Sequence, residues 1–184
     1  GNGNGGATRA AVATALLLRA GCDGPPADVA PREAGRVPPE RIPPVLNRNV
    51  DQARHLLASR GTAYVFVLHP TLAETRKPLT PREQGILAKL QANQGAGDYF
   101  SACYAAMRAG LAEVFGAPAG KLRGDGSLWL DHADVFDSRP AGEEIFLDAY
   151  HFGDRGNDLM ARRLLKDLTP LLAGRPRKAE APCA

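Results

Sequence analysis

Cysteine is scarce in this sequence, and long apolar runs are absent from it. The three cysteines, Cys22, Cys103 and Cys183, are too few and too widely spaced for a metal site or a disulfide framework, although a Cys22–Cys103 bridge stays open. No apolar stretch approaches the ~20 residues that a helix needs to cross a bilayer. We therefore expect no membrane span.

An excess of charge of one sign is also nearly absent. The formal net charge is +3 over 184 residues, and part of it lies in the terminal stretch Arg175–Lys178. Residues 175–184 are interpreted as a polar tail, and no nucleic-acid partner is expected. With 44% hydrophobic and 23% charged residues, residues 1–174 have the composition of one ordinary globular domain.

The sequence begins without an initiator methionine and without the basic and apolar segments of a signal peptide. Its first residues, Gly1–Gly6, alternate glycine and asparagine as if in the middle of a protein. We expect that upstream sequence is missing, which leaves the localisation open.

The first half of the chain predicts two helices, a loop and a strand. Helices are expected at 8–20 and 45–60, each ended by a glycine, with a proline-rich loop at 24–44 between them. Residues 62–68 form a near-continuous apolar run, which is typical of a strand covered on both faces, as in a parallel sheet. An all-α bundle is the structural alternative, but this run speaks against it.

The second half adds helices and short strands. Thr80, Pro81 and Glu83 resemble a capping box that begins a helix ending near Gln91. Further elements are expected by periodicity: helices at 99–115 and 155–172, and short strands at 127–130 and 144–147. This order predicts an α/β domain with three layers.

The sharpest chemical signal is the pair Asp148 and His151. The expected strand at 144–147 delivers the aspartate at its carboxyl end, which is where open α/β sheets bind ligands. Three-residue spacing in a tight turn lets the carboxylate reach one ring nitrogen of His151, and the other nitrogen is then available to accept a proton. The alternative is that Asp148 merely caps the turn and His151 is a surface residue.

The segment Asp148–Asn157 resembles the last conserved block of SGNH/GDSL hydrolases, in which D-x-x-H is followed five residues later by a glycine, here Gly156, and by a C-terminal helix. The stretch Asp131–Asp137 and the region Asn49–Leu72 add to the resemblance. It implies a flavodoxin-like SGNH fold truncated at its N-terminus, with Asp148 orienting His151 as general base.

The resemblance also shows what is missing. The family's serine lies in a G-D-S motif near the N-terminus, and this sequence has none; Gly124–Ser127 reads G-D-G-S and is interpreted as a turn. The family's oxyanion asparagine corresponds best to Asn2, with Asn4 as second choice; the alternative is that both belong to a flexible glycine-rich end. His69, at the end of the expected strand, is a candidate for substrate contact or a structural histidine.

The resemblance implies hydrolysis of a small-molecule or glycan ester by acyl transfer, without metal or cofactor. Because the nucleophile is absent, the chain alone is expected to be inactive. The alternatives are a carbohydrate O-acetyl esterase or acyltransferase on the same fold, and a non-catalytic binding module.

Overall fold

The computed structural model of the chain describes residues 37–94 and 98–173. In chain order these form η1 (Pro39–Arg41), α1 (Ile42–Ala58), β1 (Tyr64–Leu68), α2 (Pro81–Gln94), α3 (Asp98–Phe115), β2 (Ser127–Asp131) and α4 (Asp154–Ala173). The chain is therefore mixed α/β. The predicted helix at 8–20, Asn2, Cys22 and the tail 175–184 lie outside the described residues.

The two strands form a parallel pair. Tyr64 lies opposite Ser127 and Leu68 opposite Asp131, so the carboxyl ends of both strands lie together. Parallel strands cannot be joined by a hairpin, and α2 and α3 form the connection between them. The first four residues of β2 are buried, whereas in β1 Val65 and Val67 are only half-buried. The prediction of a strand covered on both faces is thus confirmed for only one face of β1.

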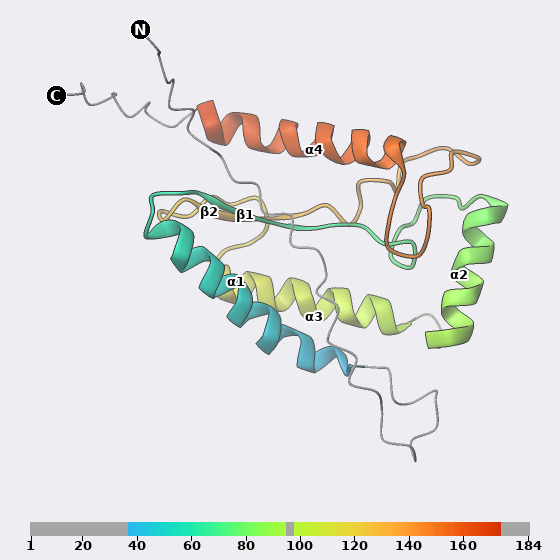
Figure 1. The fold of residues 1–184 in the computed structure, drawn as a ribbon, viewed down its shortest axis with the longest axis horizontal. Coiled ribbons are helices and arrows are strands. Elements are labelled where there is room, and N and C mark those ends of the chain that lie inside the picture. The colour runs from blue at the N-terminus through green and yellow to red at the C-terminus, as the bar shows by residue number, and fades with distance from the viewer. Residues whose placement is uncertain (1–36, 95–97, 174–184) are drawn as a thin grey trace, which may run out of the picture.

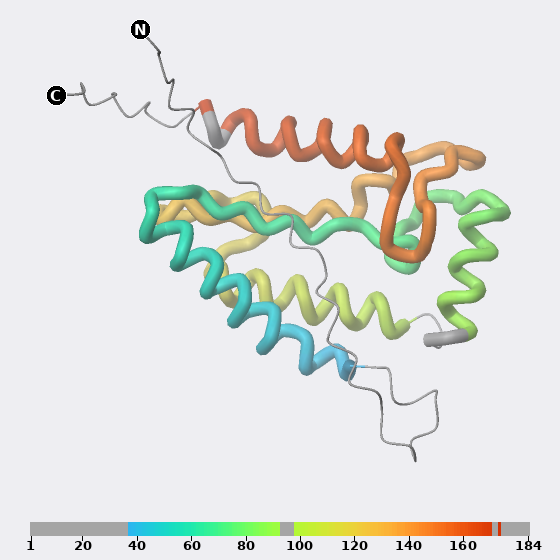
Figure 2. The backbone as a smooth tube through the Cα atoms, viewed as in Figure 1, coloured from blue at the N-terminus to red at the C-terminus, as the bar shows by residue number. Residues whose placement is uncertain are grey.

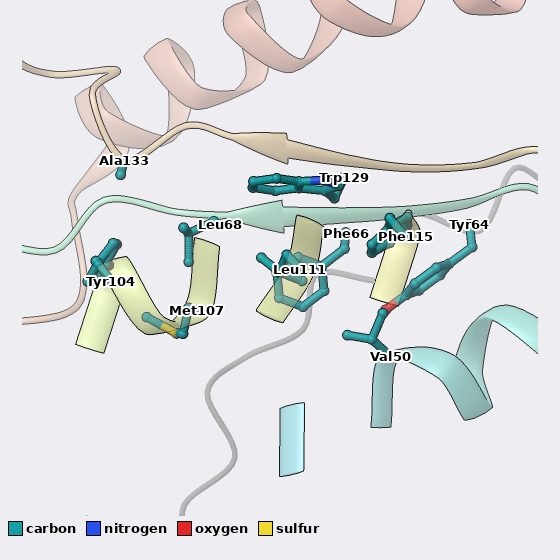
Figure 3. Close-up of a cluster of buried hydrophobic side chains, with 10 residues drawn as sticks. All are labelled: Val50, Tyr64, Phe66, Leu68, Tyr104, Met107, Leu111, Phe115, Trp129 and Ala133. Atoms are coloured by element: carbon teal, nitrogen blue, oxygen red, sulfur yellow. The ribbon is translucent and has the colours of Figure 1, made fainter. Parts of the chain in front are cut away.

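Helices lie on both sides of the strand pair, with α4 on one side and α1 and α3 on the other (Figure 1). The main buried cluster fills the space between the strands and α1 and α3 (Figure 3). Its members are Val50, Tyr64, Phe66, Leu68, Tyr104, Met107, Leu111, Phe115, Trp129 and Ala133. Alternate residues of β1 point into this cluster, and buried and half-buried side chains therefore alternate along the strand.

Helix α1 begins earlier than predicted. The sequence predicts that residues 39–44 belong to the proline-rich loop, but Pro43 and Pro44 lie in the first turn of α1. Proline is tolerated there because the first N–H groups of a helix have no partner within it. The start of α1 lies against Gly110 of α3, where an added Cβ would be 2.9 Å from Pro43 Cβ.

The predicted capping box at the start of α2 is confirmed. The Glu83 N–H donates to Thr80 Oγ1 at 3.3 Å, and the Thr80 N–H donates to Glu83 Oε2 at 2.9 Å. Glu83 also forms an ion pair with Lys77, with 2.5 Å between Nζ and Oε2, and neither side chain has exposed surface. This pair was not foreseen from the sequence.

The strand predicted at 144–147 is wrong. Residues 143–145 are irregular, and a single antiparallel bridge joins Phe146 to Phe152. The N–H groups of Ile145 and Phe146 donate to Glu83 Oε1, at 2.9 and 3.0 Å, instead of to a neighbouring strand. Asp148 therefore follows a tethered loop segment and not a strand of the sheet.

A second buried cluster holds this segment among α2, α4 and the loops after the strands. It is centred on Leu72, Phe136, Ile145 and Phe146, with residues of α2 and α4 packed around it. The rings of Phe136, Phe146 and Phe152 contact one another edge to face, with centroids 5.2–6.4 Å apart. The start of α4 is fixed here as well, because a Cβ on Gly156 would be 2.6 Å from Phe152 Cβ.

Candidate functional site

Asp148 and His151 are in direct contact, as the sequence predicts. His151 Nδ1 lies 3.0 Å from Asp148 Oδ1 and 2.8 Å from Oδ2. The two side chains are exposed, at 67% for His151 and 54% for Asp148. A carboxylate can only accept, so the neutral ring carries its proton on Nδ1 and presents the lone pair of Nε2.

The same carboxylate also closes the turn. Asp148 Oδ1 accepts the N–H groups of Tyr150 at 2.7 Å and His151 at 2.8 Å. Burial of Asp148 opposes ionisation, but these hydrogen bonds and the contact with His151 outweigh it and lower the pKa of Asp148. The capping role and the His151 contact are therefore not alternatives, because one side chain fulfils both.

The turn is fixed to the elements around it. The Leu147 N–H donates to His151 O at 2.8 Å, and the Gly153 N–H donates to Ile145 O at 2.9 Å, so residues 145–153 form a closed loop. The Leu72 N–H donates to Ala149 O at 3.0 Å, which attaches the loop to the segment after β1. Figure 2 shows the loop, just before α4, extending past the ends of the strands. Asp148 and His151 thus lie beyond the carboxyl ends of β1 and β2, where α/β sheets bind ligands.

Two further histidines in the described residues contact a carboxylate. His132 Nε2 lies 2.9 Å from Asp167 Oδ2, but the ring is 1% exposed and its Nδ1 is buried without a partner. His55 Nε2 lies 3.4 Å from Asp51 on the surface of α1. Of the three pairs, only the one at His151 combines close contact, an accessible second nitrogen and a place at the carboxyl end of the strands.

The other two predicted site residues have different outcomes. His69 directly follows β1, and its ring lies 6.4 Å, edge to face, from that of Phe152, the residue after His151. Its Nδ1 is 2.9 Å from Pro70 O. The structure therefore brings His69 near the loop, and its contact with substrate stays a prediction. Asn2 lies outside the described residues, and its oxyanion role also stays a prediction.

The chain's four serines all lie in the described residues, and no hydrogen bond joins any of them to His151. Ser127 begins β2, at the amino end of the strand, and is 1% exposed. Its hydroxyl donates to Asp125 Oδ1 at 2.6 Å, as expected for a structural turn. Since His151 lies beyond the opposite end of the strands, about 13 Å of strand separates that end from Ser127.

An open cavity of about 180 Å³ lies at the same end of the strands. It is lined by Glu74, Arg76, Arg108, Ala133, Asp134 and Asp137. Arg108 contacts Asp131 at 2.6 Å and Glu74 at 3.4 Å, which holds its guanidinium at the cavity wall. This cavity was not foreseen from the sequence, because its lining comes from three separate segments.

Comparison of the chain with protein-family models, with curated proteins and with solved structures gave no match in any of the three. Among residues 37–94 and 98–173, no helix is long and apolar enough to cross a membrane. Within the same residues, no group of three or more histidine, cysteine or acidic side chains is placed to hold a metal ion.

Proposed function

We propose that His151 is the general base of a serine ester hydrolase of the SGNH/GDSL type, and that Asp148 is the carboxylate that orients it, in a flavodoxin-like domain whose nucleophile lies outside residues 1–184. The observation that carries the proposal is the contact of His151 Nδ1 with both carboxylate oxygens, at 3.0 and 2.8 Å, in an exposed pair. It leaves Nε2 accessible as a proton acceptor.

In the proposed reaction, the serine oxygen attacks the acyl carbon while its proton passes to Nε2 of His151. The bond from the acyl carbon to the alcohol oxygen then breaks, and Nε2 returns the proton to the departing alcohol. Water repeats the sequence on the acyl-serine, releasing the carboxylic acid. Asp148 remains ionised throughout and stabilises the imidazolium, and its lowered pKa suits that role.

The positions of three of the four serines support a nucleophile from outside the chain. Ser127 is buried at the amino end of β2, away from His151. The hydroxyl of Ser59 donates to Leu56 O, and that of Ser101 donates to Glu74 Oε2. Each of these three hydroxyls thus already has an acceptor other than His151. The chain by itself is expected to hydrolyse no ester, because a base without a nucleophile cannot form the acyl intermediate.

The test uses the product of the complete gene that encodes this chain. We expect a fluorophosphonate probe to label one serine outside residues 1–184, identified by peptide mass spectrometry, and p-nitrophenyl acetate to be hydrolysed. His151→Ala should abolish labelling, and Asp148→Asn should lower kcat by about 10³–10⁴-fold, as loss of a triad aspartate does. A labelled serine within this chain, or a complete protein that is neither labelled nor active, would refute the proposal.

His55 provides the matched control. It is also an exposed histidine beside an aspartate, but it lies on α1. Its Nε2 lies 3.4 Å from Asp51 Oδ1, which is a longer contact than those of His151 with Asp148. His55→Ala should therefore leave labelling and hydrolysis unchanged. Equal losses from His55→Ala and His151→Ala would mean that the assay follows stability and not the proposed base.

A second candidate is an esterase or acyltransferase acting on O-acetyl groups of a glycan. The observation in its favour is the charged lining of the cavity, where carboxylates such as Asp134 and Asp137 can accept from sugar hydroxyls and Arg76 can donate to them. Preference for an acetylated sugar over a p-nitrophenyl ester of equal acyl length would support it. Loss of that preference in Asp134→Asn would assign it to the cavity.

A further inference from the structure

Glu83 is a fully buried acid whose two oxygens both have two donors. Oε2 accepts from Lys77 Nζ at 2.5 Å and from the Thr80 N–H at 2.9 Å. Oε1 accepts from the N–H groups of Ile145 and Phe146, at 2.9 and 3.0 Å. The carboxylate therefore links the first turn of α2 to a segment 62 residues further along the chain.

That segment leads directly into the loop of the candidate site. Phe146 lies two residues before Asp148 and forms the bridge with Phe152, the residue after His151. The two ends of the loop are thus joined at Phe146, and Phe146 is held by Glu83. By contrast, the exposed contacts at the tip of the loop are those of Asp148 itself with Tyr150 and His151.

An ionised carboxylate suits this position better than a neutral side chain. Four donors converge on Glu83, and a buried backbone N–H without an acceptor is costly. Burial opposes the charge, but Lys77 and the three N–H groups outweigh burial and lower the pKa of Glu83 to about 2. The acceptor is consequently ionised at neutral pH.

We propose that Glu83 is the positioning residue of the site, which fixes the loop so that Asp148 holds His151 with its proton on Nδ1. The inference rests on the proposed function, but the tautomer of His151 that it concerns can be measured without any catalysis. Glu83 contacts neither His151 nor a substrate, and it acts through Ile145 and Phe146.

The test compares Glu83→Gln with Thr80→Ala in the 184-residue chain. Glutamine keeps the size of the side chain but replaces one acceptor by a donor, whereas Thr80→Ala removes only the cap from the Glu83 N–H. The tautomer of His151 is measured by long-range ¹H–¹⁵N NMR at a pH where the ring is neutral, with His151→Asn used for assignment. We expect the Nδ1–H form in the wild type and in Thr80→Ala, and a shift to the Nε2–H form in Glu83→Gln.

A change in stability alone does not alter the tautomer of the folded molecule, so this readout separates positioning from a merely structural role. A folded Glu83→Gln protein with an unchanged tautomer would overturn the proposal, and so would an equal shift in Thr80→Ala. The tautomer is independent of hydrolysis, so an inactive complete protein would count against the proposed function and leave this result standing.

Amide hydrogen exchange of the wild type decides the matter if Glu83→Gln does not fold. The Ile145 and Phe146 amides should exchange at least about 100-fold more slowly than in an unfolded chain, because both donate to a buried acceptor. Exchange at rates near those of an unfolded chain would show that Glu83 does not hold the segment.

Discussion

Replacing Gly156 by alanine should destabilise the protein although it removes a glycine from a helix. The new Cβ would lie 2.6 Å from Phe152 Cβ and 3.0 Å from its Cδ2, so the backbone at Phe152 or at residue 156 must shift. Overpacking of this kind costs about 1–3 kcal/mol, and the higher helix propensity of alanine offsets up to about 1 kcal/mol of it. We expect a net loss of roughly 1–2 kcal/mol in the free energy of unfolding.

The loss is measurable by urea denaturation followed through the single tryptophan, Trp129, which is 4% exposed and belongs to the main buried cluster. At about 2–4 °C per kcal/mol, the melting temperature should fall by several degrees. Because Phe152 follows His151, the resonances of His151 should shift in the same variant.

Gly85→Ala is the matched control. Gly85 is an exposed residue inside α2, and a Cβ there would meet no atom within 4 Å. Because the main effect of this change is the higher helix propensity of alanine, the variant should be more stable than the wild type by up to about 1 kcal/mol. A Gly156→Ala protein as stable as Gly85→Ala would refute the argument that Phe152 closes the space at Gly156.

Two further predictions concern His132 and Gly110. Burial lowers the pKa of His132, with its hydrogen bond to Asp167 only partly opposing, so the unfolded chain binds a proton more readily than the folded one. Stability is then fully present above about pH 6.5 and lost as the pH falls through the folded pKa; His132→Gln should flatten this acid-side loss in urea titrations between pH 7 and 5. Gly110→Ala should lower the free energy of unfolding by about 1–3 kcal/mol, because its Cβ would be 2.8 Å from Asn47 Oδ1 and 2.9 Å from Pro43 Cβ. A thermal scan that shows no loss for Gly110→Ala would contradict the close contact of α1 and α3.

The local elements were predictable from sequence where one chemical signal acts over a few residues. The near-continuous apolar run at 62–68 locates β1, and the Thr80–Glu83 box locates the start of α2. The contact of Asp148 with His151 was predictable for the same reason, since three residues of tight turn bring the groups together.

The strand prediction at 144–147 was wrong because an apolar pattern indicates that residues are buried. It does not indicate which group accepts the hydrogen bonds of their backbone N–H groups. Whether such a run pairs with a strand depends on what lies beside it, and here the partner is the carboxylate of Glu83, 62 residues away in the sequence. Similarly, the prolines at 43 and 44 indicate a loop by composition, but they fit the first turn of α1.

The sequence by itself determined that Asp148 and His151 are in contact, because they are three residues apart in a tight turn. Only the tertiary structure decided which histidine pair is accessible, since the burial of His132 and the exposure of His151 depend on the packing of α4 and the loops around them. It also decided that a buried ion pair supports the loop. The physical reason is that spacing along a chain fixes contacts of a few residues, whereas burial and long-range hydrogen bonds exist only once distant segments have packed together.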